Sequence, residues 1–150
     1  MSESSFKAEF IKENGFYLST PQGGSMKPFI HGDTDTVVIA PVDQPLRKYD
    51  VVLYEKSTGE HVLHRVIRKK EGGYLIRGDN CYFTERVKNE QLMGRLVGLY
   101  RNGNTEKNLL DGKRYRMRVR LWVWAYPFRY AARRVVSSIR NKLKGIRRKQ

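Results

Sequence analysis

A serine in a glycine-rich segment is the first residue of this sequence whose type and position could do chemistry. Ser25 follows Gly23 and Gly24, precedes Met26-Lys27-Pro28, and lies just ahead of the apolar run Val37-Val38-Ile39. Flexible glycines before it and a rigid proline after it could hold the hydroxyl exposed in a fixed loop, as a nucleophile requires. A serine in such a segment can also be an ordinary turn residue. The catalytic hypothesis therefore depends on partners further along the chain.

Histidine and acidic residues at the ends of later β-like runs could be those partners. His64 lies in a run rich in β-branched residues, Asp79 follows the run Tyr74-Leu75-Ile76-Arg77-Gly78, and Glu85 comes six residues after Asp79. Such a set could supply nucleophile, general base and orienting carboxylate. Burial would keep the His64 ring neutral near pH 7. A core histidine, an Asx-turn aspartate and a solvated glutamate are the structural alternatives.

Five short motifs occur in a fixed order between residues 25 and 80. They are Ser-Met-x-Pro (Ser25 to Pro28), Gly-Asp (Gly32, Asp33), Asp-Val-Val (Asp50 to Val52), His-Arg-Val-Ile (His64 to Ile67) and Gly-Asp-Asn (Gly78 to Asn80). In these motifs the chain resembles the signal peptidase I superfamily of serine peptidases, which includes the LexA-type repressors. The resemblance spans about residues 15–101, and histidine at position 64 is similar to the archaeal, endoplasmic-reticulum and sporulation-type members.

The resemblance implies roles for particular residues. It implies Ser25 as nucleophile, His64 as general base, and Asp79 as an essential acid, with Glu85 standing where the family has a second Asp. Either acid could contact His64. The oxyanion hole would include the Ser25 N–H, and Gly23 stands where some bacterial relatives have a further serine donor. Substrate-binding or oxyanion residues are expected at Gly23, Gly24, Met26 and Pro28.

Length and charge predict one domain with a basic tail. A chain of 150 residues can bury one modest core. Residues 113–150 contain 14 Lys and Arg and no acidic residue, whereas residues 1–112 contain 16 basic and 15 acidic residues. We expect a short helix over residues 1–14, a signal peptidase-like catalytic domain over 15–112 and the tail over 113–150. The fold class predicted is mainly β, a signal peptidase- or LexA-like β-fold with a C-terminal basic amphipathic helix.

The predicted elements follow apolar periodicity. Ser2 to Asn14 fits a short helix that presents Phe6, Phe10 and Ile11 and stops at Gly15. Alternating apolar residues predict five strands, with hairpin loops at Ser57 to Glu60 and at Lys69 to Gly73; the strands are Thr36–Ile39, Asp50–Glu55, His61–Ile67, Tyr74–Gly78 and Gly94–Tyr100. The segment Arg116 to Val123 fits a strand or the start of a helix, and Pro127 interrupts it.

The tail combines aromatic and basic residues with helical spacing. Apolar residues recur from Phe128 to Ile146 at helix periodicity, including Leu143, and basic residues lie largely on the other faces. We expect Trp122, Trp124, Tyr126 and Phe128 to contact an anionic membrane surface. Nucleic-acid binding, a partner protein and an unstructured tail are the alternatives.

The termini and the single cysteine bear on location. Charges interrupt the first fifteen residues, and the longest apolar run, Leu121 to Phe128, has eight residues against the ~20 of a spanning helix. We therefore expect no signal peptide and no transmembrane helix, and a peripheral protein on the cytoplasmic side. Cys81 excludes an intramolecular disulfide, and we expect it to be a small filler. No cofactor or metal is expected.

These observations predict a serine endopeptidase of the signal peptidase I type. Its partner would be a signal, leader or precursor peptide, which the resemblance implies is bound by strand addition and cut after small residues. The alternatives are a LexA-like self-cleaving or DNA-binding regulator and a non-catalytic adaptor with the same fold. The LexA-like alternative predicts a Lys base and a DNA-binding motif ahead of the domain, whereas this chain has His64 and only 24 residues before Ser25.

Overall fold

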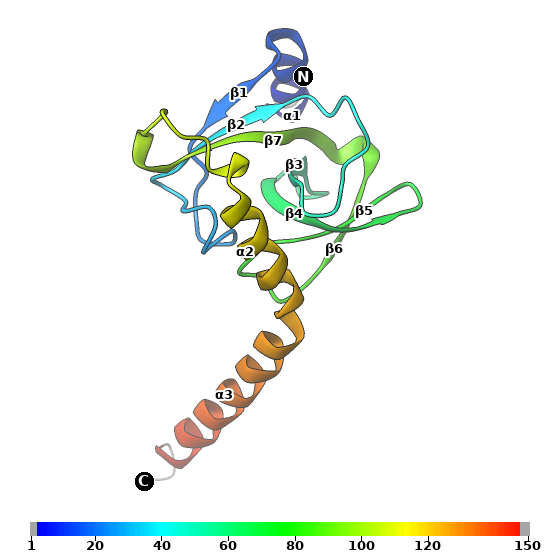
Figure 1. Cartoon of the computed structure of the whole chain (residues 1–150). Coiled ribbons are helices and arrows are strands. Elements are labelled where there is room, and N and C mark those ends of the chain that lie inside the picture. Colours follow the sequence, from blue (N-terminus) through cyan, green and yellow to red (C-terminus); the bar gives the residue numbers. More distant parts are fainter. Residues whose placement is uncertain (1–2, 148–150) are drawn as a thin grey trace.

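The computed structural model describes the backbone of residues 3–147 and the side chains of residues 9–140. The side chains of Phe6, Leu143 and Ile146, which we assigned to apolar helix faces, lie outside the described residues. Seven strands form one antiparallel sheet that curls on itself (Figure 1), in the order β1-β2-β7-β3-β4-β5-β6. The strands are β1 (Tyr17–Ser19), β2 (Thr36–Ala40), β3 (Val51–Glu55), β4 (His61–Lys70), β5 (Gly73–Arg77), β6 (Glu85–Lys88) and β7 (Leu92–Tyr100).

The prediction of a mainly β protein is confirmed, as are the five strands. The sequence did not reveal β1 and β6, which have three and four residues and lie at the two edges of the sheet. An edge strand needs few apolar side chains, and in β6 only Val87 is buried. Their patterns are therefore too short to show an alternation.

The hairpin turns set the register that positions the site. Lys56 and Glu60 close the β3–β4 hairpin with a 2.9 Å backbone hydrogen bond, and Gly59 adopts a φ of 82° within it. Val52 consequently pairs with His64, and Tyr54 pairs with Val62. Side chains two residues apart on paired strands share a face, so Tyr54 and His64 are diagonal neighbours.

Two apolar clusters form the core. One is built on Ile11, Phe29, Ile39, Leu99 and Val119, which join both ends of the chain to β2 and β7. The other lies among β3, β4, β5 and β6 and is built on Val52, Tyr54, Val66, Ile76 and Val87. His64 is therefore on a strand whose neighbours are fixed by packing on both sides.

Helix α1 (Glu3–Asn14) confirms the predicted N-terminal helix and its stop. Ile11 is fully buried against the sheet, whereas Phe10 is 39% exposed and has an edge-to-face contact with Tyr17. Gly15 ends the helix with a φ of 77° and donates its N–H to the carbonyl of Ile11.

The predicted tail divides into two helices. Residues 109–111 form a short 3₁₀ turn, after which α2 (Lys113–Trp124) packs on the domain through Tyr115, Val119 and Trp122. Their spacing of four and three residues is helical, and this settles the segment Arg116 to Val123 as helix rather than strand. Pro127 lies in the first turn of α3 (Tyr126–Arg147), where a proline ring is tolerated.

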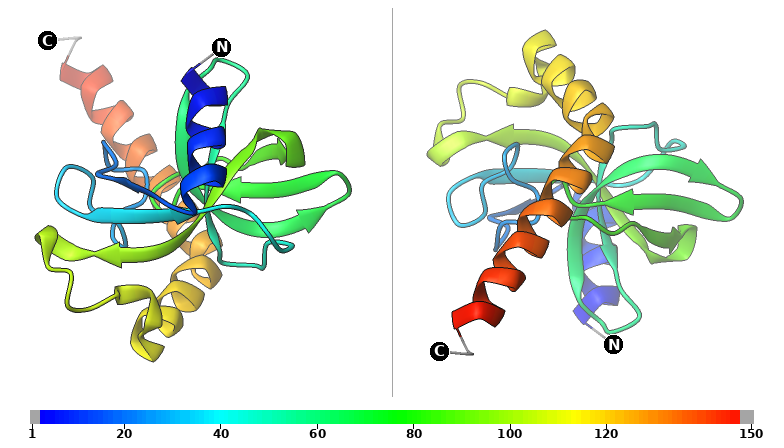
Figure 2. Two further views of the ribbon diagram at one scale, coloured as in Figure 1. Left: turned by 90° about the horizontal axis from the view of Figure 1, so that it is seen from above. Right: turned by 90° about the horizontal axis from the view of Figure 1, so that it is seen from below.

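The second of these helices leaves the domain. Views from above and below place α1 and α3 on opposite sides of the sheet (Figure 2), and α3 extends away from it. Among the described residues, none of the helices is both long enough and apolar enough to span a membrane.

Candidate functional site

The Ser25 segment is a tight turn braced by backbone contacts. The Met26 carbonyl accepts from the N–H groups of Phe29 and Ile30 at 3.1 Å each. Gly32 packs so closely on this loop that a Cβ would lie 2.7 Å from the Gly23 nitrogen and closer still to its carbonyl oxygen. The two glycines thus allow the two arms of the loop to touch, with the hydroxyl at Ser25 partly exposed.

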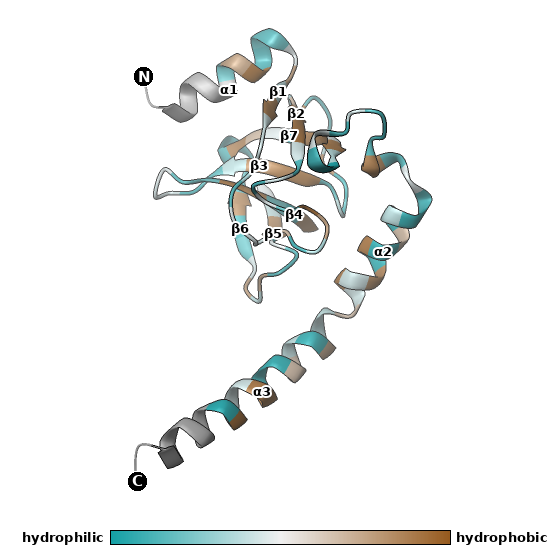
Figure 3. Cartoon of the chain, turned by 90° about the vertical axis from the view of Figure 1, so that its left-hand side faces the viewer, coloured by the Kyte–Doolittle hydropathy of each residue, from teal (hydrophilic) through white to brown (hydrophobic). Residues whose placement is uncertain are grey.

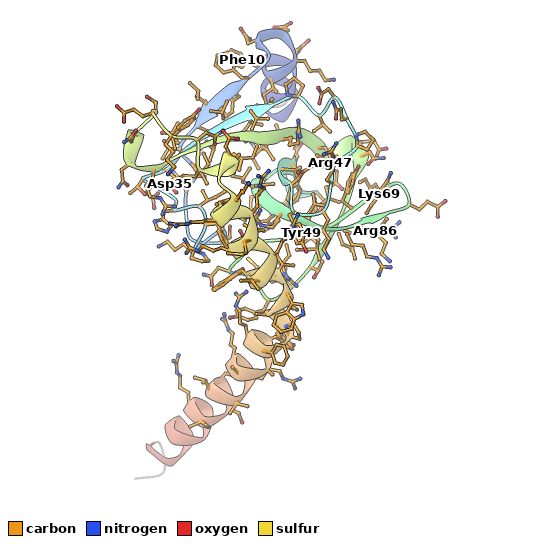
Figure 4. All side chains as sticks on the ribbon, in the orientation of Figure 1. Phe10, Asp35, Arg47, Tyr49, Lys69 and Arg86 are labelled. Carbon is orange, nitrogen blue, oxygen red and sulfur yellow. The ribbon has the colours of Figure 1, made fainter. Side chains whose placement is uncertain are left out.

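An ion pair between buried Asp35 and half-buried Arg101 anchors the far end of this loop. Asp35 is fully buried and accepts from the His31 N–H at 2.8 Å (Figure 4). Arg101 donates to both Asp35 oxygens, at 3.2 and 3.1 Å, and to the Phe29 carbonyl at 3.0 Å. Because this guanidinium joins the loop to the end of β7, the loop is fixed to the sheet at its base.

The Gly-Asp-Asn motif holds the serine loop in place. Asn80 donates its backbone N–H to the Ser25 carbonyl at 2.7 Å and its side-chain amide to the Gly24 carbonyl at 3.2 Å. At Gly78, a Cβ would lie 2.8 Å from the Ser25 carbonyl oxygen and 2.9 Å from His64 Nε2. The Ser25 carbonyl and the His64 ring therefore both lie against Gly78, which separates them without a side chain of its own.

His64 is buried, with 3% of its surface exposed, and its two ring nitrogens face different groups. Nε2 faces Gly78 and the serine loop. On the other side, Nδ1 lies 3.2 Å from the Tyr54 hydroxyl and 3.8 Å from Glu85 Oε1. Tyr54 donates its single hydroxyl proton to Glu85 Oε2 at 3.0 Å, so its oxygen can accept from an Nδ1–H. This series of hydrogen bonds from His64 through Tyr54 to Glu85 favours the tautomer that is protonated on Nδ1 and has a free lone pair on Nε2.

Burial also sets the protonation states of this cluster. Loss of solvent lowers the pKa of His64 below the usual histidine value, and the Glu85 carboxylate partly opposes this shift. Burial and the neighbouring Glu85 charge raise the pKa of Tyr54, which stays a neutral donor. Glu85 Oε1 is buried and accepts no hydrogen bond from the described residues. An imidazolium formed at His64 would find its counter-charge there.

The structure pairs the other acid, Asp79, with Arg65 and not with His64. Its two carboxylate oxygens accept from Arg65 Nε and Nη2 at 2.7 Å each, and both side chains are about 2% exposed. Burial opposes the charge of Arg65, but Asp79 and the hydroxyl of Tyr115 raise its pKa overall. The Asp79 carbonyl accepts from Trp122 Nε1 at 2.8 Å and Arg129 Nη2 at 3.1 Å. Asp79 thus joins β4, the motif turn and the C-terminal helices.

Ser25 and His64 line a groove of about 570 Å³. Gly23 and Met26 also line it, whereas Gly24 and Pro28 do not. Two free strand edges border it within the described residues: β1 is paired only with β2, and β5 pairs with β4 only from Arg65 onward. The backbone of residues 62–64 therefore keeps an open side next to the catalytic candidates.

Cys81 and the aromatic residues of the tail occupy distinct positions. Cys81 lines the groove and its thiol has a raised pKa because of burial and the Glu85 charge. Trp122 and Tyr126 are half-buried and bind the carbonyls of Asp79 and Tyr82. Trp124 and Phe128 are exposed and lie 5.6 Å apart between ring centroids. Of the four predicted membrane-contacting residues, two are thus already engaged by the domain.

Sequence reasoning missed the residues that support the chemistry. Tyr54, Arg65 and the amide of Asn80 received no role, although the predicted β3–β4 hairpin puts Tyr54 diagonal to His64. Within the described part of the chain, no three His, Cys, Asp or Glu side chains are grouped to hold a metal ion. The sequence matches neither a model of a known protein family nor a curated protein.

Proposed function

We propose that this protein is a serine endopeptidase of the signal peptidase I type, with Ser25 as nucleophile and His64 as general base. One observation carries the proposal. The Ser25 carbonyl and His64 Nε2, from segments almost forty residues apart, both approach Gly78, and both residues line the same groove. A second set of contacts, through Tyr54 to Glu85, ties down the opposite side of the histidine ring.

The chemistry follows from these positions. His64 Nε2 accepts the proton of the Ser25 hydroxyl while Oγ attacks the carbonyl carbon of the substrate. The imidazolium formed faces Glu85 and then gives its proton to the leaving amine. Water, deprotonated in turn by His64, hydrolyses the acyl-enzyme and restores the serine.

The oxyanion that forms needs donors in the serine loop. Among the described residues the Ser25 N–H makes no hydrogen bond, and Asn80 holds the Ser25 carbonyl on the opposite side of the residue. This N–H is therefore free to donate to a tetrahedral intermediate.

The groove suits an extended peptide. Free backbone edges at β1 and at residues 62–64 offer N–H and C=O groups to a strand laid between them. Phe83, at the rim, is 58% exposed and would contact an apolar side chain. Signal, leader or precursor peptides are the substrate class we propose.

The test is cleavage of a diverse peptide library, read by mass spectrometry. We expect Ser25→Ala and His64→Ala to lower kcat/KM about 1,000-fold or more, with melting temperatures close to wild type. Ser19→Ala, which removes another hydroxyl from the same groove, is the matched control and should cleave normally. Undiminished cleavage by Ser25→Ala would rule out the proposal, and a folded wild type that cuts no peptide would favour a non-catalytic adaptor.

A further inference from the structure

The exposed side of α3 is an apolar stripe. Phe128, Val135 and Ile139 recur at helical spacing on one face and are 65%, 59% and 53% exposed. Figure 3 shows apolar positions alternating with hydrophilic ones along α3, which runs clear of the sheet domain. An amphipathic helix usually buries such a stripe against its own domain.

Here the opposite face of the helix contacts the domain. The Tyr126 ring lies 3.4 Å from the Arg77 guanidinium, and its hydroxyl donates to the Tyr82 carbonyl at 2.9 Å. Arg129 stacks 3.6 Å from the Trp122 ring, and Arg133 lies 4.3 Å from the Tyr82 ring. Tyrosines and arginines of α3, rather than its aliphatic residues, therefore attach it to the domain.

Helix geometry fixes where the stripe then points. At 100° per residue, the face of Tyr126, Arg129 and Arg133 lies roughly 130° around the helix from the face of Phe128, Val135 and Ile139. The attachment through arginine and tyrosine thus turns the apolar stripe away from the protein. The described side chains beyond the first turns of α3 stand clear of the sheet domain (Figure 4).

The charge of the tail indicates which kind of partner would cover this apolar stripe. Residues 113–150 carry 14 basic and no acidic side chains, so a second copy of the same helix would be repelled. Duplex nucleic acid could bind the basic side chains, but its phosphate backbone offers no apolar layer to cover the stripe. An anionic bilayer surface offers both negative headgroups and an apolar layer beneath them. Trp124 is 70% exposed and lies beside Phe128, and aromatic rings favour the headgroup boundary of a bilayer.

We propose that α3 lies along an anionic membrane surface with its apolar stripe in the interface. Arg134 and Arg140 lie about 120° around the helix from the stripe, one on either side, and their long side chains would reach headgroups there, while the Tyr126–Arg133 face holds the domain above the membrane. This inference is independent of the peptidase proposal, because the catalytic residues take no part in it.

Co-sedimentation of the full chain with vesicles tests the proposal. Neutral phosphatidylcholine vesicles are compared with vesicles containing phosphatidylglycerol, using Ser25→Ala protein so that self-cleavage cannot interfere. We expect at least tenfold tighter binding to the anionic vesicles, weakened by salt at about 0.5 M. Val135→Gln with Ile139→Gln should weaken binding about tenfold or more, because two apolar anchors are lost. Ser137→Gln, on another face of the same helix, is the matched control and should bind like the parent protein.

Other results would overturn the proposal. Equal vesicle binding by the stripe variant and the Ser137 control would show that charge alone attracts the helix. Binding of duplex DNA in the absence of vesicle binding would make nucleic acid the partner. A lipid-free dimer, seen by analytical ultracentrifugation and lost in the stripe variant, would make a second copy the occupant. Circular dichroism of each variant confirms that α3 is retained.

Discussion

Glu85 is a carboxylate one methylene longer than the aspartate expected at its position, and this length matters at the scale of single residues. It lies on an edge strand, with Oε1 3.8 Å from His64 Nδ1 and Oε2 bonded to Tyr54. A tyrosine hydroxyl fills the remaining gap between acid and base. Tyr54 and Glu85 together can thus orient the histidine ring.

The pH dependence of cleavage tests this arrangement. His64 must be neutral to act as base, and burial lowers its pKa, so the acid limb of kcat/KM should lie below the ordinary histidine value of about 6.5. The Glu85 charge raises that pKa. Glu85→Gln should therefore move the limb to still lower pH and reduce the plateau rate. Tyr54→Phe keeps the charge, so it should reduce the rate with little movement of the limb. A wild-type profile in Glu85→Gln would make Glu85 an ordinary surface acid.

The ion pair of Asp79 with Arg65 gives this acid a role in the stability of the folded protein. Asp79→Asn leaves the buried guanidinium of Arg65 without its counter-charge, so we expect a loss of about 3–5 kcal/mol in unfolding free energy. Urea denaturation measures it. Glu85→Gln, which unpairs no buried cation, should cost less than about 1 kcal/mol. Similar stabilities of the two variants would contradict the assignment of Asp79 to the fold.

At the scale of elements, the turn of residues 78–80 connects the segments that form the site. It touches the serine loop through Asn80, β4 through Arg65 and α2 through Trp122. A small displacement of this turn would therefore separate Ser25 from His64 while leaving each on its own intact element.

Gly78→Ala makes that displacement directly. The added Cβ would crowd the Ser25 carbonyl and the His64 ring at under 3 Å, so we expect kcat/KM to fall about 100-fold. Steady-state kinetics with the best library peptide measures it. Gly24→Ala is the control, because its Cβ would meet only the flexible Lys27 side chain, 3.6 Å away. Normal activity of Gly78→Ala would contradict a catalytic role for Ser25 and His64 on either side of Gly78.

At the scale of the whole molecule, one loop connects the groove to the projecting helix. Tyr82 contacts the rings of Tyr126 and Tyr130 and the guanidinium of Arg133, and the next residue, Phe83, lines the groove. A membrane surface that bound α3 would therefore also keep the groove close to the membrane. Under both proposals, the substrates that reach the groove would be peptides near a membrane.

Removal of the Tyr82 ring should loosen α3. Aromatic pairs contribute about 0.5–1.5 kcal/mol, so tryptic cleavage after Arg129 and Arg133 should become about 2- to 10-fold faster in Tyr82→Ala. Mass spectrometry of a time course measures it. Tyr82→Phe keeps the ring and the backbone carbonyl that Tyr126 contacts, so it should be cleaved like the wild type. Equal rates in all three proteins would mean that Tyr82 does not hold the helix.

Local pattern was sufficient for several features of this protein. Alternating apolar residues predicted the β class and five strands, glycine and helical spacing predicted α1, and the motifs drew attention to Ser25, His64, Asp79 and Glu85. These features depend on neighbours within a few residues, because periodicity is a local property of the chain.

Only the tertiary structure decided which groups meet. Glu85 reaches His64 through Tyr54, and Asp79 pairs with Arg65, because strand register and packing across 14 to 31 positions aim each side chain. The same holds for the tail. Its amphipathic pattern was evident in the sequence, but contacts of Arg129 and Arg133 with rings of the domain determine that the apolar stripe points outward. A sequence specifies the faces of a helix, whereas the partner of each face depends on the rest of the fold.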